Sequence, residues 1–131
     1  MNNLADAPAV RSTVLVVEDE PTIIVMARMV LERAGYAVLG AASGPDAVAV
    51  FRDNDQIAVV VLDLNLPGLN GWEVLAELRR LRPDARVVLT TGSTIDDTPA
   101  AEPQHLPTAV LPKPYRPADL VAVVGRLLAA R

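Results

Sequence analysis

The sequence predicts an α/β fold in which a five-stranded parallel β-sheet is covered by helices on both faces. Five short runs of Val, Leu and Ile lack polar alternation, which is typical of strands buried on both faces. Each of the first four runs is separated from the next by a segment long enough for a helix, and a helical segment follows the fifth. Repeated strand–helix alternation of this kind indicates a parallel sheet, because parallel strands need a long crossover between them.

The predicted strands are the most apolar short runs of the chain. They cover residues 13–17, 37–42, 57–62, 86–90 and 109–111. The third run, IAVVVL, is the strongest strand signal. In a parallel sheet with helices on both faces, ligands bind at the carboxyl ends of the strands. The residues directly after each run are therefore candidate functional residues.

Signals for helix ends delimit four predicted helices. Pro21 suits a first helical turn and Gly35 a helix stop. Ser43 is the predicted N-cap of the second helix, with Asp46 three residues later as in a capping box, and Asn70 is the predicted N-cap of the third. The four helices are predicted at residues 21–35, 43–53, 70–81 and 117–130.

The segment between the fourth and fifth strands is a poor helix former. Residues 93–107 contain Pro99, Pro103 and Pro107. A proline inside a helix removes a hydrogen bond and clashes with the preceding turn, at a cost of about 3 kcal/mol. We therefore expect the fourth helix of the alternation to be short or irregular.

Length and composition indicate one globular domain. Of the 131 residues, 51% are hydrophobic and 21% charged, and we assign 12–131 to the domain and 1–11 to a flexible leader. A net charge of −4 without a basic tail argues against direct nucleic-acid binding. The absence of cysteine excludes disulfides and thiolate metal sites. Without a signal peptide or an apolar run near the roughly 20 residues that span a bilayer, we expect a cytoplasmic protein with no membrane contact.

Charged and hydroxyl side chains come after four of the five predicted strands. Glu18 and Asp19 follow the first strand, Asp63 the third, Thr91 the fourth and Lys113 the fifth. Each has an ordinary structural explanation alone, such as an acidic helix start, a turn-forming aspartate or a solvated lysine. Their coincidence at one edge of a parallel sheet indicates a functional site. Lys113, in VLPKPY, is also the only lysine of the chain.

The chemistry of these side chains fits phosphoryl transfer to a carboxylate. Clustered carboxylates repel one another unless a cation lies among them, and an oxygen-only cluster suits Mg²⁺. An aspartate can act as nucleophile while a lysine and a hydroxyl contact the phosphoryl oxygens. An ammonium is a compact charge on a flexible stem, which suits approach to a single phosphoryl oxygen.

Four motifs in this chain resemble those of the receiver domain of two-component response regulators. They are VLVVEDE, VLDLNLPGLNG, VVLTTGS and LPKPY, in this order. The resemblance covers the chain from about residue 12 to 130 and implies the flavodoxin-like receiver fold, with strand order 2-1-3-4-5. It implies that a sensor histidine kinase or a histidine phosphotransfer protein donates a phosphoryl group, and that phosphorylation changes the binding of a downstream protein.

The resemblance also implies a role for each acidic residue. Asp63 matches the phosphorylated aspartate, and it also contributes to the metal site. Glu18 and Asp19 match the acidic pair that holds Mg²⁺, with Asp19 as the direct ligand. The backbone carbonyl of Asn65 would complete the protein's share of the metal shell.

The remaining site residues match groups that contact the phosphoryl group. Thr91 matches the hydroxyl that hydrogen-bonds it and moves on activation, and Lys113 matches the lysine that pairs with the aspartate or its phosphate. The family commonly has a cis peptide bond after this lysine, so Lys113–Pro114 is expected to be cis. Three residues fit the loop after the phosphorylation site: Pro67, Gly68 and Gly71.

The chain departs from the family pattern in the part that transmits the signal. The family often has an aromatic residue three positions before the lysine, where this chain has Val110. The proline-rich segment 93–107 also replaces the helix that usually helps form the output face. The first or the last helix is therefore an alternative output surface. We expect a monomer or weak dimer.

Two other functions are compatible with parts of the pattern. A haloacid-dehalogenase-like phosphatase also uses an aspartyl nucleophile and Mg²⁺, but it has a second Asp two residues on, where this chain has Asn65. A receiver fold that binds partners regardless of phosphorylation stays open as the alternative. We expect the domain to catalyse only its own phosphorylation and dephosphorylation, and no reaction of another substrate.

Four arginines gather near the end of the third predicted helix. They are Arg79, Arg80, Arg82 and Arg86. A solvated helix C-terminus explains such a cluster, since cations are favourable there. A partner-binding patch is the alternative.

Overall fold

The computed structural model describes residues 11–66, 70–92 and 107–129. Its strands are β1 (Thr13–Val17), β2 (Ala37–Ala41), β3 (Ile57–Asp63), β4 (Val87–Thr91) and β5 (Ala109–Pro112). Its helices are α1 (Pro21–Arg33), α2 (Gly44–Asp53), α3 (Gly71–Leu81) and α4 (Pro117–Ala129). The predicted strands and the four delimited helices are all present, with ends that shift by no more than two residues.

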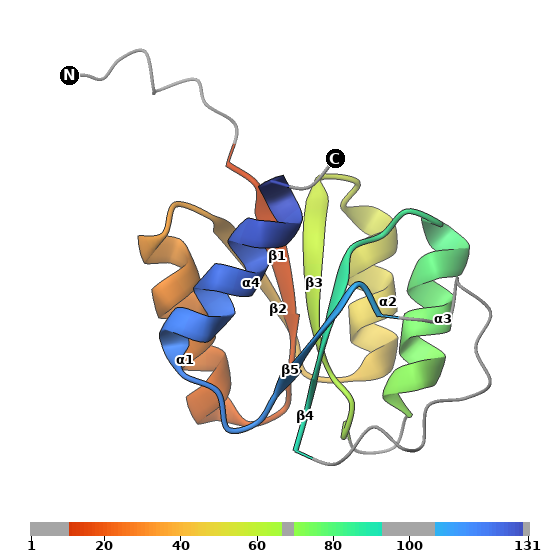
Figure 1. The fold of residues 1–131 in the computed structure, drawn as a ribbon. Coiled ribbons are helices and arrows are strands. Elements are labelled where there is room, and N and C mark those ends of the chain that lie inside the picture. The colour runs from red at the N-terminus through yellow and green to blue at the C-terminus, as the bar shows by residue number, and fades with distance from the viewer. Residues whose placement is uncertain (1–10, 67–69, 93–106, 130–131) are drawn as a thin grey trace.

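The strands form one parallel sheet in the order β2-β1-β3-β4-β5. Helices α1 and α4 cover one face of the sheet, and α2 and α3 cover the other (Figure 1). The predicted fold class and strand order are confirmed. The strand order reverses at β1, which lies between β2 and β3, so the crevice expected for a ligand opens at the carboxyl ends of β1 and β3.

Each face of the sheet has its own hydrophobic core. The core under α2 and α3 includes Leu15, Phe51, Leu62, Leu75 and Leu78. The core under α1 and α4 includes Val14, Leu31, Val61, Leu120 and Val124. Successive residues of a strand point to opposite faces, so neighbours such as Val61 and Leu62 serve different cores. This two-sided burial explains why the strands show no polar alternation.

The predicted helix caps are present. Ser43 Oγ accepts a hydrogen bond from the Asp46 N–H at 3.2 Å, and Asn70 Oδ1 accepts one from the Trp72 N–H at 2.8 Å. Gly35 follows α1 with φ of +103°, a backbone conformation that favours glycine at a helix end. These caps fix where α1, α2 and α3 begin or end relative to the strands.

Two sequence predictions fall mainly outside the described residues. Residues 1–10 of the predicted leader and residues 93–106 of the predicted short helix are not described. Both stay predictions. Among the described helices, none combines the length and the apolar character needed to cross a membrane.

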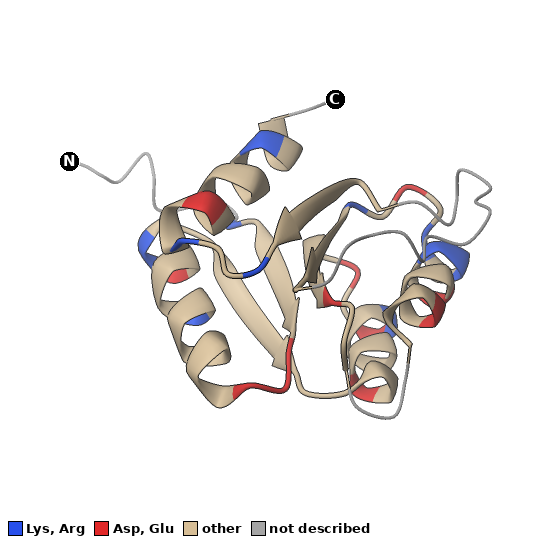
Figure 2. Cartoon of the chain, turned by 60° about the horizontal axis from the view of Figure 1, so that its bottom comes forward, with Lys and Arg blue, Asp and Glu red and all other residues tan. Residues whose placement is uncertain are grey.

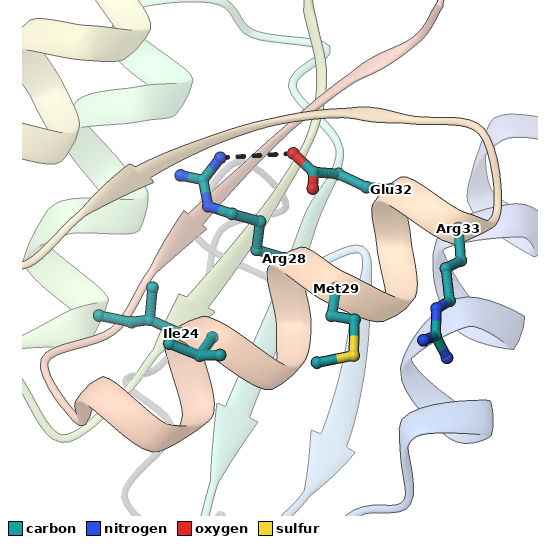
Figure 3. Close-up of a pocket in the computed structure, with 6 residues that line it drawn as sticks. Ile24, Arg28, Met29, Glu32 and Arg33 are labelled. Carbon is teal, nitrogen blue, oxygen red and sulfur yellow. Dashed lines mark ion pairs between the residues drawn. The ribbon is translucent and has the colours of Figure 1, made fainter.

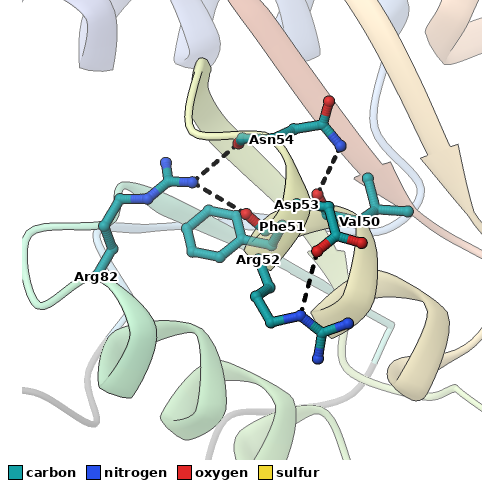
Figure 4. Close-up of polar contacts among 6 residues, drawn as sticks. All are labelled: Val50, Phe51, Arg52, Asp53, Asn54 and Arg82. Atoms are coloured by element: carbon teal, nitrogen blue, oxygen red, sulfur yellow. Dashed lines mark hydrogen bonds and ion pairs between the residues drawn. The ribbon is translucent and has the colours of Figure 1, made fainter.

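The Arg82 side chain makes hydrogen bonds within the fold and is not simply a solvated charge. Its guanidinium donates hydrogen bonds to the carbonyl oxygens of Phe51, Asn54 and Ile57 at 3.1, 3.0 and 2.7 Å, and Figure 4 shows the first two. The guanidinium carbon lies 3.9 Å from the centre of the Phe51 ring. The end of α2 and the start of β3 therefore share one side chain from the end of α3.

Arg79 also makes hydrogen bonds to other parts of the fold. It donates to the Ala85 carbonyl oxygen at 2.8 Å and to the Thr108 hydroxyl at 3.1 Å. The expected solvated cluster is thus wrong for Arg79 and Arg82, because backbone carbonyls and a hydroxyl lie within reach of their several donors. Arg80 is exposed and pairs with Glu77.

Candidate functional site

The carboxyl ends of the strands lie along the lower edge of the sheet in Figure 1. Figure 2 turns this edge forward and shows the acidic loop between β1 and α1. Strand pairing continues to the predicted site, since Asp63 lies opposite Thr90, and Thr91 lies opposite Pro112. Asp63 and Thr91 are therefore the last residues of β3 and β4, whereas the sequence placed them one position after each strand. The sheet itself positions them.

Three carboxylates form an acidic cluster at this edge. One oxygen each from Glu18, Asp19 and Asp63 lies within 4.8 Å of the others. Glu18 and Asp63 are buried, each 3% exposed, whereas Asp19 is exposed. The cluster is thus reached from solvent on the side of Asp19, and its oxygen donors fit a hard divalent cation such as Mg²⁺.

Lys113 is shared by two of these carboxylates. Its Nζ lies 3.1 Å from Glu18 Oε1 and 3.3 Å from Asp63 Oδ2, and its side chain is 21% exposed. Burial alone would lower the pKa of Lys113, but the hydrogen bond to Glu18 and the charges of Asp63 and Glu18 raise it above its usual value. The ammonium is therefore held in its charged form between β1 and β3.

The Glu18 carboxylate is buried beside Lys113. Burial raises the pKa of Glu18 and the charge of Asp63 raises it further, while the hydrogen bond from Lys113 acts in the opposite direction. Its Oε2 accepts a hydrogen bond from the Glu20 N–H at 3.2 Å. The cluster contains three carboxylates, and one ammonium contacts two of them, so negative charge remains in excess, and a divalent cation would balance it. The residues present fit Mg²⁺ for this reason.

The backbone after β3 holds the Asp63 carboxylate. The Asn65 N–H donates to Asp63 Oδ1 at 3.0 Å. The Leu64 N–H donates to the Thr90 carbonyl oxygen at 2.9 Å, and the Leu64 carbonyl oxygen accepts from the Gly71 N–H at 3.2 Å. The two residues after the candidate nucleophile are therefore tied to β4, to α3 and to the carboxylate itself.

Thr91 and Lys113 are linked through the backbone. The Thr91 carbonyl oxygen accepts a hydrogen bond from the Lys113 N–H at 2.7 Å, and Thr91 is 1% exposed. The Lys113–Pro114 peptide bond is cis, as the resemblance led us to expect. The sequence-predicted site residues lie at the same edge of the sheet: Glu18, Asp19, Asp63, Asn65, Thr91 and Lys113. Pro67 and Gly68 lie outside the described residues.

A hollow of about 490 Å³ opens beside Lys113. Its other lining residues are Ile23, Met26, Gly92, Pro114 and Tyr115. Burial raises the pKa of Tyr115, and the charge of Glu18 raises it further, so this half-buried ring lies within electrostatic reach of the acidic cluster. Sequence reasoning did not identify this apolar rim. The place of Tyr115, two residues after Lys113, is the signal that could have indicated it.

A second hollow lies on the surface of α1, and the residues of the acidic cluster do not line it (Figure 3). Val25 and Met29 there are 60% and 44% exposed. Arg28 and Glu32 form an ion pair of 3.5 Å beside them. This surface presents apolar side chains among charges and is separate from the chemistry at the sheet edge.

The family model of the response regulator receiver domain matches residues 14–125 of this chain. The chain therefore belongs to the response regulator receiver domain family, the class of domain found in two-component systems. Receiver domains generally use Mg²⁺, in keeping with the acidic cluster described above.

Curated relatives include a sensor kinase and response regulators. Sensor kinase CckA of Brucella abortus is 31% identical over 118 residues, which are 89% of this chain and 12% of that protein. Response regulator SaeR of Staphylococcus aureus is 27% identical over 114 residues, which are 87% of this chain and 49% of that protein. The chain thus spans less than half the length of these two relatives.

Solved receiver structures share the fold. A CheY-like receiver domain protein from Methanospirillum hungatei has a TM-score of 0.84 and 25% identity, with 91% of this chain and 94% of that one covered. Chemotaxis protein CheY4 of Vibrio cholerae has a TM-score of 0.81 and 27% identity, with 90% and 99% covered. Both matches cover nearly the whole of a receiver chain, so this chain is similar to a complete receiver fold.

Proposed function

We propose that this receiver domain is the phosphoacceptor of a two-component phosphorelay, in which Asp63 takes a phosphoryl group from a phosphohistidine donor in a Mg²⁺-dependent reaction. One observation carries the proposal. The buried Asp63 carboxylate has an ammonium 3.3 Å from Oδ2 and a backbone N–H 3.0 Å from Oδ1, inside a cluster of three carboxylates. A nucleophile, a mobile cation and a divalent-cation site thus coincide at the switch point of the sheet.

The proposed transfer changes two bonds. An Asp63 carboxylate oxygen attacks phosphorus, and the P–N bond to the donor histidine breaks with its electron pair kept by the imidazole nitrogen. In the later hydrolysis, a water oxygen attacks phosphorus and the P–O bond to Asp63 breaks, which restores the carboxylate and releases inorganic phosphate. We propose that the domain catalyses these reactions of itself only, and none of another substrate.

The surrounding groups supply charge and position. Lys113 already contacts Asp63, so a small movement of its flexible stem brings the ammonium to a phosphoryl oxygen. Thr91 supplies a hydroxyl at the end of the neighbouring strand. The carboxylates of Glu18, Asp19 and Asp63 and the carbonyl of Asn65 would hold Mg²⁺, which neutralises charge on the phosphoryl oxygens when bound.

We propose a sensor histidine kinase or a histidine phosphotransfer protein as the donor. Matches to a sensor kinase and to response regulators support this class of partner. The apolar rim beside Lys113, with Ile23, Met26 and Tyr115, supports a donor histidine that is part of a protein, because an apolar surface suits contact with another protein. The downstream partner, the cytoplasmic location and the monomeric or weakly dimeric state stay predictions from the sequence.

Intact mass spectrometry after incubation with a small phosphoramidate tests the chemistry without a partner. We expect a mass gain of one phosphoryl group in the presence of Mg²⁺, and none after chelation or in Asp63→Asn. Asp55→Asn is the matched control, because Asp55 is exposed and precedes β3 at the opposite edge of the sheet. A folded wild-type protein that gains no mass would contradict the proposal.

Such a result would favour a receiver fold that binds partners regardless of phosphorylation. Val110 supports this second candidate, because a valine on β5 stands where the family often places an aromatic residue. Phosphorylation-independent binding predicts that wild type and Asp63→Asn bind a partner equally well.

A further inference from the structure

We infer that Gly71 is a positioning residue for the metal and phosphoacceptor site, required because no side chain fits between the start of α3 and the backbone after Asp63. A Cβ at Gly71 would lie 2.7 Å from Leu64 Cα, 2.9 Å from the Leu64 carbonyl oxygen and 3.1 Å from Leu64 Cδ1. The two shortest contacts are to backbone atoms, which cannot rotate away. This inference rests on the proposed function of the site.

Backbone freedom does not explain the glycine. Among the described residues, only Gly35 has a positive φ. Gly71 therefore has a backbone conformation that any L-residue can adopt. Gly71 is also the first residue of α3, after the Asn70 cap, where alanine is a better helix former than glycine. Helix propensity alone would therefore make Gly71→Ala neutral or stabilising. Only the space beside Leu64 opposes it.

The space matters because Leu64 is joined to the site on both sides. Leu64 directly follows Asp63, and the next residue, Asn65, donates its N–H to Asp63 Oδ1 at 3.0 Å. The hydrogen bonds of Leu64 to Thr90 and Gly71 hold this turn in place. A Cβ at Gly71 would push Leu64 away by several tenths of an ångström, and the Asn65 N–H and carbonyl would move with it.

The test compares Gly71→Ala with Gly40→Ala. At Gly40 a Cβ would meet the Arg28 Nη2 at an ordinary 3.6 Å, so this control makes the same substitution without a clash. Mg²⁺ affinity is measured by calorimetry under conditions where circular dichroism shows each variant folded. We expect Gly71→Ala to bind Mg²⁺ about 10-fold or more weakly than wild type, the range typical when a supporting residue is lost. Gly40→Ala should bind as wild type does.

A spectroscopic readout separates positioning from simple destabilisation. In ¹H–¹⁵N spectra without metal, the Asn65 amide signal should shift in Gly71→Ala, because its hydrogen bond to Asp63 changes, and stay in place in Gly40→Ala. Wild-type Mg²⁺ affinity together with an unchanged Asn65 signal in folded Gly71→Ala would overturn the inference. So would a variant that remains unfolded even at low temperature with a stabilising osmolyte, since the whole fold would then need the glycine.

The outcome is distinct from failure of the proposed function. If wild type itself binds no Mg²⁺ and accepts no phosphoryl group, the proposed function fails, and the inference about Gly71 fails with it. If wild type does both and Gly71→Ala matches it, only the inference fails.

Discussion

At the scale of single residues, the site is organised around one cation between two buried carboxylates. Lys113 comes from the end of β5, Glu18 follows β1 and Asp63 ends β3, so the contacts of 3.1 and 3.3 Å join distant parts of the chain. Removing one partner from such a group leaves the others buried without compensation. The same side chains therefore stabilise the domain and form the proposed site.

Replacing Lys113 by methionine should destabilise the metal-free protein. The substitution keeps the apolar stem but leaves Glu18 and Asp63 without their ammonium. Because Lys113 is partly exposed, we expect a loss of about 2–3 kcal/mol, below the 3–5 kcal/mol of fully buried pairs. Urea unfolding measures it, and saturating Mg²⁺ should recover part of the loss. Unchanged stability without metal would show that the contacts do not stabilise the fold.

Glu18 gives a pH dependence of stability with a defined sign. Burial raises its folded pKa above the usual 4.5, so between 4.5 and the raised value the native state holds more protons than the unfolded state. The stability contributed by Glu18 is present below pH 4.5 and is lost as pH rises through the folded pKa. Urea unfolding from pH 4 upward measures the free energy of unfolding of metal-free wild type and of Glu18→Gln. As pH rises, wild type should lose stability relative to Glu18→Gln. A difference that stays constant over this pH range would contradict the prediction.

At the scale of elements, the hydrogen bonds that place the site are distinct from those that hold the opposite edge of the sheet. Arg82 joins the end of α3 to the end of α2 and the start of β3, away from the carboxyl ends of the strands. The Leu64–Gly71 contact instead joins the start of α3 to the end of β3. One helix is therefore fastened at both ends, and each end can be tested separately.

Arg82→Lys should lower stability without affecting the site. A lysine cannot donate in the planar fork that reaches three carbonyl oxygens, so we expect a loss of about 1–2 kcal/mol in urea unfolding. Arg80→Lys, at a side chain 74% exposed, should stay within about 0.5 kcal/mol of wild type. Mg²⁺ affinity should be the same in both variants. A large effect of Arg82→Lys on Mg²⁺ affinity would show that the two ends of α3 are coupled.

At the scale of the whole molecule, periodicity and end signals were sufficient for the fold. Strands buried on both faces have no polar alternation, and Ser43, Asn70 and Gly35 mark helix ends by local chemistry. The site residues were predictable because each lies at or just beyond the end of a strand. The identity of a residue at a strand end is local information, and a parallel sheet brings such residues to one edge.

Contacts between distant segments were not predictable in this way. The burial of Glu18, the three carbonyls bound by Arg82 and the clash at Gly71 depend on which backbone lies opposite a residue. No periodic pattern in one sequence encodes those distances. The arginine cluster was misread for this reason, since its spacing suits a solvated helix end equally well.

Binding of Mg²⁺ should stabilise the whole domain in proportion to its occupancy. The cluster exists only in the folded chain, so the ion binds the native state and stabilises it by about 2.7 kcal/mol at 100 times the Kd. Thermal unfolding should therefore show a Tm that rises with Mg²⁺ concentration. Asp19→Asn should abolish most of the rise, because Asp19 is the exposed carboxylate through which the cluster is reached. Asp55→Asn should leave it intact, since Asp55 lies at the opposite edge of the sheet. An equal rise in Asp19→Asn would place the ion elsewhere and remove the metal from the proposed site.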